Sequence, residues 1–467
     1  MQTVSQPADA RVRVVVATTV LLSFISFWRA AAIVLSDLGS TAFYVGGIVE
    51  QAIGKSAPWF VLGVMLFSYA VRAVYVESSA MFVRGGVYRV VKEAMGGTVA
   101  KLSVSALLFD YVLTGPISAV SAGQYIGGLA NDIMHRMGSL QTLPVDTTSA
   151  FIAILITVYF WWRNTQGLHE SSDDALRIVK ITTVMVVIMI AWCSLTLLLR
   201  GGQLPPPPTL RNLHFSDEGL GWLRGSVLPK FTAIALLVGF GHSILAMSGE
   251  ESLAQVYREI EHPKVQNLLR TGLVIFVYSL VFTTLVSFFA VAIIPDAVRA
   301  KFYDNLISGL AMNVVGPMWL RLAFQAFVVV VGFLILAAAV NTAIVGSNGV
   351  LNRVSEDGVL TEWFRRPHPR YGTSYRLINL IVLLQLATIV LSRGDVYVLG
   401  EAYAFGVVWS FAFKSLAMFV LRYTEADVPR EFKVPLNPRI GGREVPVGLG
   451  LIALVLFSAA AINLFTK

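Results

Sequence analysis

The chain contains little charge and almost no cysteine. Only 14% of its 467 residues are Asp, Glu, Lys or Arg, whereas soluble domains contain about 25%. The one cysteine, Cys193, lies inside an apolar run, so neither a disulfide within the chain nor a thiolate metal site is expected. These shortages argue against a soluble globular protein and against a disulfide-stapled one.

Several functional motifs are also missing from the sequence. It contains no Walker-type phosphate loop, which argues against ATP-driven transport. It contains no filter motif of the TVGYG type, which argues against an ion channel. No nucleophile–base motif stands out, so we do not expect an enzyme, and we expect no cofactor.

Apolar side chains are present in excess and make up 56% of the residues. We therefore expect an all-α membrane protein whose main partner is the lipid bilayer. The net charge of +8 would suggest nucleic acid as a partner for a soluble protein. Because basic residues of membrane proteins gather in loops on one side, we expect no nucleic-acid partner here. The N-terminus shows no signal peptide with a small-residue cleavage site.

Eleven apolar runs are long enough to cross a bilayer, since about 30 Å of hydrocarbon needs about 20 helical residues. Lys and Arg are concentrated in loops on the same side as the N-terminus, which predicts a multi-pass cell-membrane protein with a cytoplasmic N-terminus. A further apolar stretch, residues 14–27, is short, and it raises the count to twelve if it spans. The expected spans are 28–53, 57–82, 101–131, 148–163, 175–199, 229–255, 267–294, 321–346, 375–393, 396–421 and 446–466.

Glycine and polar residues interrupt the first and sixth spans. In the first span the interruption includes Asp37 and the helix-breaking Gly39, and in the sixth it includes Gly249, Glu250 and Glu251. Interruptions at corresponding positions of two halves are typical of inverted-repeat transporters, whose unwound backbone binds substrate or ions. Small residues also allow close helix packing, but packing alone does not explain buried acids.

The third span carries a polar stripe within the apolar stretch SVSALLFDYVLTGPISAVSAGQYIGGL. Asp110, Tyr111, Thr114 and Ser118 follow the spacing i, i+1, i+4 and i+8, so they lie on roughly one side of a helix. A carboxylate at the centre of a membrane helix costs about 2.5–3.5 kcal/mol on insertion scales. The stripe therefore indicates a binding site inside the helix bundle.

Three motifs resemble those of the amino acid–polyamine–organocation superfamily. They are RGGVYRVVKEAMGG at 84–97, SGEESLAQVYREIEHPK at 248–264 and NTAIVGSNGVLNRVSEDGVLTEWFRRPHPRYGTS at 341–374. The resemblance implies a LeuT-type fold of two inverted five-helix repeats, with broken helices one and six and about 11–12 membrane helices. It also implies a division into an N-terminal cytoplasmic or interfacial segment 1–27, a first repeat 28–199, an extracellular loop 200–228, a second repeat 229–421, and a cytoplasmic loop with the final helix 422–467. A homodimer is one expected assembly.

Within the superfamily, the site motifs look most like those of KimA-type potassium importers. A Thr of that pattern is replaced by Ser248, Glu250 is an additional acid, and no large C-terminal regulatory domain follows the helices. The residues that match the importers' site are Asp37, Ser40, Thr41 and Tyr44 in the first helix, Asp110, Tyr111, Thr114 and Ser118 in the third, Ser248, Gly249 and Glu251 in the sixth, and Tyr403 in the tenth.

The residues fit a secondary active transporter, and they leave two substrate classes open. Hydroxyl and carbonyl oxygens suit potassium, which exchanges its waters for several neutral oxygens, and a bound K⁺ is expected near Asp37 and Tyr111. The alternative is an amino-acid or polyamine permease, in which free N–H groups at Gly39-Ser40-Thr41 hold a carboxylate or the acids hold an amine. We favour potassium as the small substrate.

A proton is the expected coupling ion. Many amino-acid permeases of the superfamily carry a lysine deep in helix five in place of sodium, but the stretch RIVKITTVMVVIMIAW has a lysine only near its start, at Lys180. A buried carboxylate must then carry the proton, and Asp110, Glu250 and Glu251 are the candidates, with Asp110 favoured.

Other polar residues in the spans have simpler expected roles. His242 either caps the break of the sixth helix or relays a proton. We expect Glu401 to face the outer vestibule. Lys414, Arg72 and Glu77 lie near the inner ends of their spans, where we expect long charged side chains to reach the membrane interface.

Overall fold

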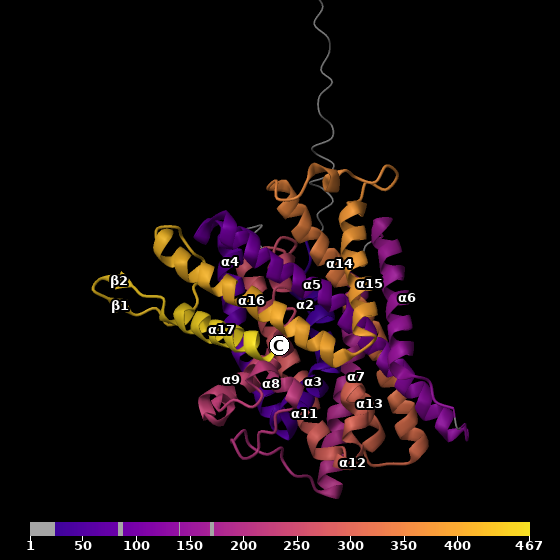
Figure 1. The fold of residues 1–467 in the computed structure, drawn as a ribbon. Helices are drawn as coiled ribbons and strands as arrows, with labels where there is room; N and C mark the ends of the chain where they lie inside the picture. Colours follow the sequence, from indigo (N-terminus) through magenta and orange to yellow (C-terminus); the bar gives the residue numbers. More distant parts are fainter. Residues whose placement is uncertain (1–23, 83–86, 140, 169–171) are drawn as a thin grey trace, which may run out of the picture.

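The computed structural model describes residues 24–82, 87–139, 141–168 and 172–467, and nearly all of its elements are helices (Figure 1). Ten helical stretches of these residues are long and apolar enough to cross a membrane. The first of them, Phe27–Met81, contains both the first and the second expected span, so the ten stretches hold all eleven spans. The short apolar stretch 14–27 lies almost wholly outside the described residues.

Nine long helices among the described residues contain no 3-10 segment, although α5 is kinked at Gly96. They are α4 (Ala57–Met81), α5 (Val87–Arg136), α6 (Val145–Thr165), α7 (Ser172–Arg200), α11 (Lys264–Ile293), α14 (Met318–Glu356), α15 (Tyr375–Ser392), α16 (Val396–Thr424) and α17 (Val447–Thr466).

The first and sixth membrane helices are broken in the middle. The first consists of α2 (Phe27–Leu38), the 3-10 helix η1 (Gly39–Phe43) and α3 (Val45–Ile53). The sixth consists of α9 (Thr232–Ser243), η5 (Ile244–Met247) and α10 (Ser252–Val256), with turns at 248–251. A 3-10 segment shifts the backbone hydrogen-bond pattern, so both breaks expose carbonyl groups at mid-helix. The breaks coincide with the interruptions that the sequence predicts.

The shorter elements connect the long helices at the two ends of the bundle. They are η2 (Gly54–Ser56), α8 (Asp217–Leu220), η3 (Gly221–Leu223), η4 (Leu228–Lys230), α12 (Asp296–Arg299), η6 (Ala300–Asn305), α13 (Leu306–Asn313), η7 (Glu362–Arg365) and an antiparallel hairpin of β1 (Arg439–Ile440) and β2 (Arg443–Glu444).

Two helices are longer than the apolar runs that predicted them. The third span starts at Val87 rather than near residue 101, and the eighth continues to Glu356 rather than ending near residue 346. The added turns carry charged side chains such as Lys92 and Arg353, which interrupt the apolar pattern. In α5 these turns form a separate helical stretch, because Gly96 has a non-helical backbone with φ +83° and ψ 174°.

Burial separates central helices from peripheral ones. The most apolar windows of α5, α14 and α16 are each 72% buried, whereas those of α6, α7 and α15 are 28%, 33% and 33% buried. The first group therefore forms the core of the bundle, and the second group presents apolar side chains outward, as lipid contact requires. Figure 1 shows α6 and α15 along one side of the molecule.

Three charged side chains expected at the membrane interface are buried instead. Lys414, Arg72 and Glu77 are 1%, 3% and 0% exposed, so that expectation is wrong. The Arg72 Nε donates to Glu250 at 2.7 Å, and the Arg422 Nε and Nη2 donate to Glu77 at 2.6 and 2.9 Å. These bidentate partners come from distant parts of the sequence, and they offset the cost of burying the Arg72 and Glu77 charges.

Gly249 in the helix-six break provides a test of this packing. Its φ is +98°, and a Cβ there would lie 2.8 Å from the Leu38 nitrogen. We predict that Gly249→Ala lowers the free energy of unfolding by about 1–3 kcal/mol, because the backbone must hold a strained conformation. Scanning fluorimetry of the detergent-purified protein measures the shift in melting temperature.

The matched control for this substitution is Gly63→Ala. Gly63 is exposed on α4, and a Cβ there meets no described atom within 4 Å. Alanine favours a helix over glycine by about 1 kcal/mol, so the control should melt at the same temperature or slightly higher. Equal melting temperatures for the two variants would contradict the assigned close approach of the two helix breaks.

Candidate functional site

The two helix breaks meet α5 and α16 in the centre of the bundle. Every sequence-predicted binding residue of this centre is at most 2% exposed. These residues are Asp37, Ser40, Thr41 and Tyr44 from the first helix, Asp110, Tyr111, Thr114 and Ser118 from α5, Ser248 from the helix-six break, and Tyr403 from α16.

Hydroxyl groups from three elements form a hydrogen-bonded chain at this centre. Ser248 Oγ contacts Tyr403 Oη, Tyr403 Oη lies 2.7 Å from Thr114 Oγ1, and Thr114 Oγ1 lies 3.0 Å from the Asp110 carbonyl oxygen. A carbonyl only accepts, so one assignment satisfies all three contacts. In it, Ser248 donates to Tyr403, Tyr403 donates to Thr114, and Thr114 donates to the carbonyl.

This direction leaves lone pairs rather than hydrogens facing the centre. A hydroxyl has one hydrogen and two acceptor lone pairs. Within this row of hydroxyl groups, Tyr403 and Thr114 each donate one hydrogen bond and accept one. One lone pair therefore remains free on each oxygen. The helix-one hydroxyls follow the same rule, because Ser40 Oγ donates to the Asp37 carbonyl at 2.7 Å and Thr41 Oγ1 to the Leu38 carbonyl at 2.7 Å.

Further oxygens at the centre have no hydrogen-bond partner among the described residues. They are both carboxylate oxygens of Asp110, the Tyr44 hydroxyl and the Ser118 hydroxyl. Leaving such groups buried and unpaired costs about 1–3 kcal/mol each, and more when the group is charged. The centre therefore holds the unpaired Asp110 carboxylate together with several hydroxyl lone pairs and the unpaired hydroxyl hydrogens of Tyr44 and Ser118.

The four acids of the region have different surroundings. Asp37 accepts a hydrogen bond from Ser252 Oγ at 2.8 Å, which ties the first helix to α10. Glu250 faces Arg72 in a bidentate ion pair and is not directed at the other acids. Glu251 accepts from the Gly249 nitrogen at 3.2 Å with one oxygen, while its other oxygen has no partner among the described residues. Asp110 is thus the acid with neither oxygen hydrogen-bonded among the described residues, and Glu251 is the acid with one oxygen unbonded.

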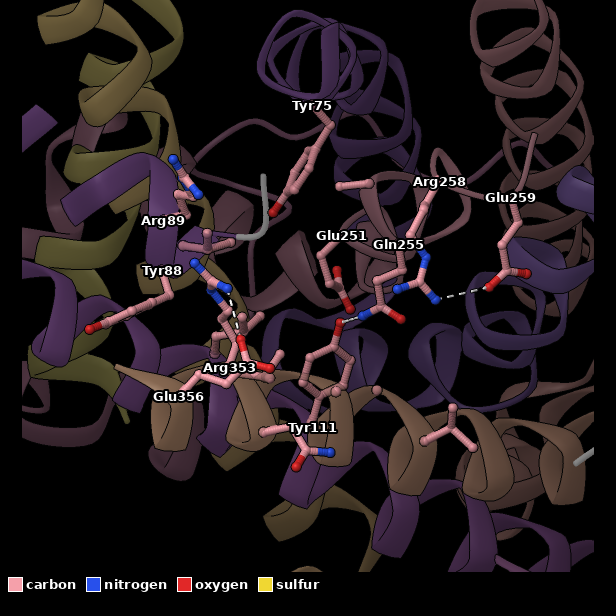
Figure 2. Close-up of a pocket in the computed structure, with 18 residues that line it drawn as sticks. Tyr75, Tyr88, Arg89, Tyr111, Glu251, Gln255, Arg258, Glu259, Arg353 and Glu356 are labelled. Atoms are coloured by element: carbon pink, nitrogen blue, oxygen red, sulfur yellow. Dashed lines mark hydrogen bonds and ion pairs between the residues drawn. The ribbon is translucent and has the colours of Figure 1, made fainter. Parts of the chain in front are cut away.

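A vestibule of about 560 Å³ opens below this centre (Figure 2). Its walls come from the C-terminal end of α4, the N-terminal part of α5, α10 and the C-terminal end of α14, with Tyr75, Tyr88, Glu251, Arg258 and Arg353 among the lining residues. The vestibule is the route from one face of the molecule to the buried acids.

Tyr111 closes the inner end of the vestibule. Figure 2 shows its hydroxyl bonded to Gln255, whose side-chain amide donates to it. A Cβ at Gly346 would lie 3.0 Å from the Tyr111 ring, so only glycine lets α14 approach this ring so closely. Glu251 thus lines the vestibule together with Tyr111 and Gln255, whereas Asp110 does not line it.

An ion pair lines a second, smaller pocket of about 230 Å³ that shares Arg89 and Arg353 with the vestibule. Lys92 Nζ donates to Asp357 at 2.8 Å and joins α5 to the end of α14. The Lys92 hydrogen bond holds the pKa of Asp357 below its usual range, so this carboxylate stays ionised at neutral pH.

Sequence reasoning missed Gln255, Ser252 and Arg72 as parts of the site. Gln255 follows Glu251 by one helical turn, which is a signal that could have placed it beside the vestibule. The Ser252–Asp37 and Arg72–Glu250 contacts join residues more than 170 positions apart. No spacing in the sequence reveals such contacts.

Comparisons with known proteins agree with this architecture. Residues 25–467 match the family model described as amino acid permease. A crystal structure of a manganese transporter from Eremococcus coleocola superposes with a TM-score of 0.53 at 14% identity, covering 99% of this chain and 88% of that chain. A second structure of that transporter gives 0.54 at 13% identity with the same coverage. The expected LeuT-type transporter fold is thereby confirmed.

Curated relatives include transporters with different substrates. The potassium transporter KimA of Bacillus subtilis (strain 168) is 25% identical over 405 residues, covering 84% of this chain and 60% of that protein. The branched-chain amino acid permease BcaP of the same organism is 23% identical over 409 residues, covering 84% of this chain and 79% of that protein. At these identities the relatives support transport and leave the substrate open.

Because several oxygen lone pairs at this centre remain free, we predict that a monovalent cation stabilises the purified protein. Melting temperature should rise with potassium chloride more than with equal N-methylglucamine chloride, because bound ligand favours the folded state. Thr114→Val and Ser118→Ala each remove one ligand oxygen. Each should weaken the apparent affinity about tenfold, or ~1.4 kcal/mol.

Thr157→Val is the matched control for the threonine change. Thr157 is also buried on a helix and donates to a backbone carbonyl, but it lies on the peripheral α6. The control should keep the wild-type cation response. If Thr114→Val and Ser118→Ala also keep it, the stripe on α5 is a packing seam and not a ligand set.

Proposed function

This chain belongs to the amino acid permease family, and we propose that it is a secondary active transporter that imports potassium together with a proton. The observation that carries the proposal is the row of hydroxyl contacts from Ser248 through Tyr403 and Thr114 to the Asp110 carbonyl. This row lies beside the buried Asp110 carboxylate, whose two oxygens have no hydrogen-bond partner among the described residues. Neutral oxygens with a nearby negative charge suit a weakly hydrated monovalent cation.

The same accounting weighs against an amino-acid substrate. The carboxylate of an amino acid needs hydrogen-bond donors, and half-helix N–H groups supply them in related folds. At this site the hydroxyl hydrogens of Ser40, Thr41 and Thr114 are engaged by carbonyl groups. The backbone N–H groups of the helix-one break and the hydroxyl hydrogens of Tyr44 and Ser118 remain for such a carboxylate.

One observation favours the second candidate, an amino-acid or polyamine permease. The vestibule volume of about 560 Å³ lies in the range of organic-ligand pockets, about 300–1,000 Å³, and exceeds what a bare ion requires. The buried acids would also suit an organic ammonium group. The relative BcaP is named as an amino acid permease.

Uptake into proteoliposomes distinguishes the two candidates. Rubidium as a tracer for potassium is compared with a panel of radiolabelled amino acids and polyamines under an inward proton gradient. The proposal expects saturable rubidium uptake that excess potassium suppresses. Uptake of an amino acid or polyamine without rubidium uptake would support the permease instead.

We assign the coupling proton to Asp110. We place the vestibule on the cytoplasmic side, because the distribution of Lys and Arg in the loops predicts that orientation. Asp110 is fully buried, and its two oxygens have no hydrogen-bond partner among the described residues. Glu251 is the second candidate, because it is buried and one of its two oxygens has no hydrogen-bond partner among the described residues. Glu250 is the weakest candidate, because its ion pair with Arg72 favours the ionised form.

The first transport prediction concerns Asp37→Asn, which keeps the shape of the side chain and removes its charge. Rubidium uptake should fall at least about a hundredfold, because a charged ligand in a dry site contributes about 3 kcal/mol or more. Surface expression and monodispersity should match wild type. The exposed Asp427→Asn serves as the control, and wild-type uptake by Asp37→Asn would refute the role of this carboxylate.

The second transport prediction concerns Asp110→Asn. This variant should lose accumulation driven by a proton gradient, so that the internal tracer concentration only equals the external one. Exchange of internal for external potassium should persist, because exchange does not require net proton movement. Accumulation that needs sodium, or that survives collapse of the proton gradient, would rule out this coupling.

A further inference from the structure

His242 is buried where α9 ends, and both of its ring nitrogens are bonded. Nε2 lies 2.7 Å from the Gly219 carbonyl oxygen of α8, and Nδ1 lies 3.0 Å from the Glu401 carboxylate of α16. The imidazole is fully buried. It joins three elements at the face opposite the vestibule, where Figure 1 shows α8 and α9 close together.

The two partners of His242 are both oxygen atoms. The Gly219 carbonyl cannot donate, so it accepts a hydrogen from Nε2. The Glu401 carboxylate, which also lies 3.2 Å from Lys467 Nζ, is placed to accept a hydrogen from Nδ1. Both ring nitrogens therefore face acceptor oxygens, an arrangement that a doubly protonated ring satisfies.

Other charged groups near α9 do not replace these partners. Those on the elements packed around it are Glu401, Lys414 and Arg422 on α16, Lys467 after α17, Asp217 and Glu218 on α8, Lys230 on η4, Glu50 on α3, and Arg72 and Glu77 on α4. Glu50 is bonded to Arg299, and Arg72 and Glu77 have the partners described above. Of the set, only Glu401 is bonded to His242 in the part of the chain that the structure describes.

We propose that His242 is a proton-binding residue whose protonation holds the face opposite the vestibule closed. Loss of one proton would leave a lone pair of Nδ1 facing the Glu401 carboxylate and would break the link between α9 and α16. The helix that carries His242 continues through η5 to Ser248, which contacts Tyr403 of the same α16. Loss of a proton from His242 therefore loosens the contact between α16 and the broken sixth helix, which together hold the hydroxyl chain.

The inference adds a second proton-binding residue to the proposed transport cycle. Only the part that His242 plays in that cycle rests on the proposed function. A proton arriving from the outer side would close that face while the vestibule is open to the inner side. Protonation of His242 would then follow substrate entry and precede release on the inner side, while the proton that drives import stays assigned to Asp110.

Accessibility of an introduced cysteine tests the proposal without any substrate. Ala52 on α3 is fully buried, and its carbonyl accepts the Ser216 nitrogen beside α8 at 3.0 Å. Ala52→Cys is made in a Cys193→Ser background and labelled in detergent with a maleimide at about pH 5.5 and about pH 8.5, on both sides of the range in which histidines change charge. Each rate is divided by that of the denatured protein at the same pH.

The expected result is labelling that is about tenfold faster at the higher pH, as for loss of one hydrogen bond to a charged group. In His242→Gln, which cannot titrate, labelling should be equal at both pH values. The control is His214→Gln, an exposed histidine of the loop before α8, and it should keep the tenfold change. Equal labelling of the parent at both pH values, or an unchanged pH response in His242→Gln, would overturn the proposal.

A transport measurement covers the case in which Ala52→Cys does not fold. Uptake by the protein with no introduced cysteine is recorded against external pH at fixed internal pH, and His242→Gln should lose a pH response that His214→Gln keeps. A response retained in His242→Gln would overturn the proposal. If rubidium is not transported, labelling still tests His242, and a failure of labelling leaves rubidium uptake as a separate test of the substrate.

Discussion

The site depends on one constraint: several of its oxygen atoms are buried without a hydrogen-bond partner among the described residues. Inside a bundle of low dielectric, an unpaired carboxylate or hydroxyl lone pair is costly until a cation or a proton occupies it. The Asp110 carboxylate and the hydroxyls of Tyr44 and Ser118 are held in that condition by the packing around them. Ligand binding removes the free-energy cost of burying these unpaired oxygens. Binding is therefore coupled to the geometry of the surrounding helices.

The broken helices make this arrangement possible. A continuous helix would bond its own carbonyl groups, whereas η1 and the turns before α10 bring the breaks of helices one and six together beside α5. Paired charges at other depths keep the elements in register: Arg72 with Glu250, Glu77 with Arg422, and Glu50 with Arg299. The site is therefore left acceptor-rich while most other buried charges are neutralised.

Sequence alone predicted the architecture well, because apolar runs and helix interruptions are local patterns. The eleven spans, the two breaks and the family all follow from them. The stripe on α5 was visible because helical spacing places Asp110, Thr114 and Ser118 on one side. Partners across the bundle were not visible, since no local pattern links Asp37 to Ser252 or His242 to Glu401. For the same reason Lys414 was wrongly expected at the interface, although it lies over the ring of Tyr75.

The central claim is that the lone pairs around Asp110 hold a dehydrated monovalent cation. A structure determined with thallium, which scatters anomalously and resembles potassium in size and charge, tests this claim most directly. The account predicts an anomalous peak within contact distance of Thr114, Tyr403 and the Asp110 carboxylate. Absence of a peak there, with amino-acid density bonded to the nitrogens of residues 39–41 instead, would contradict it.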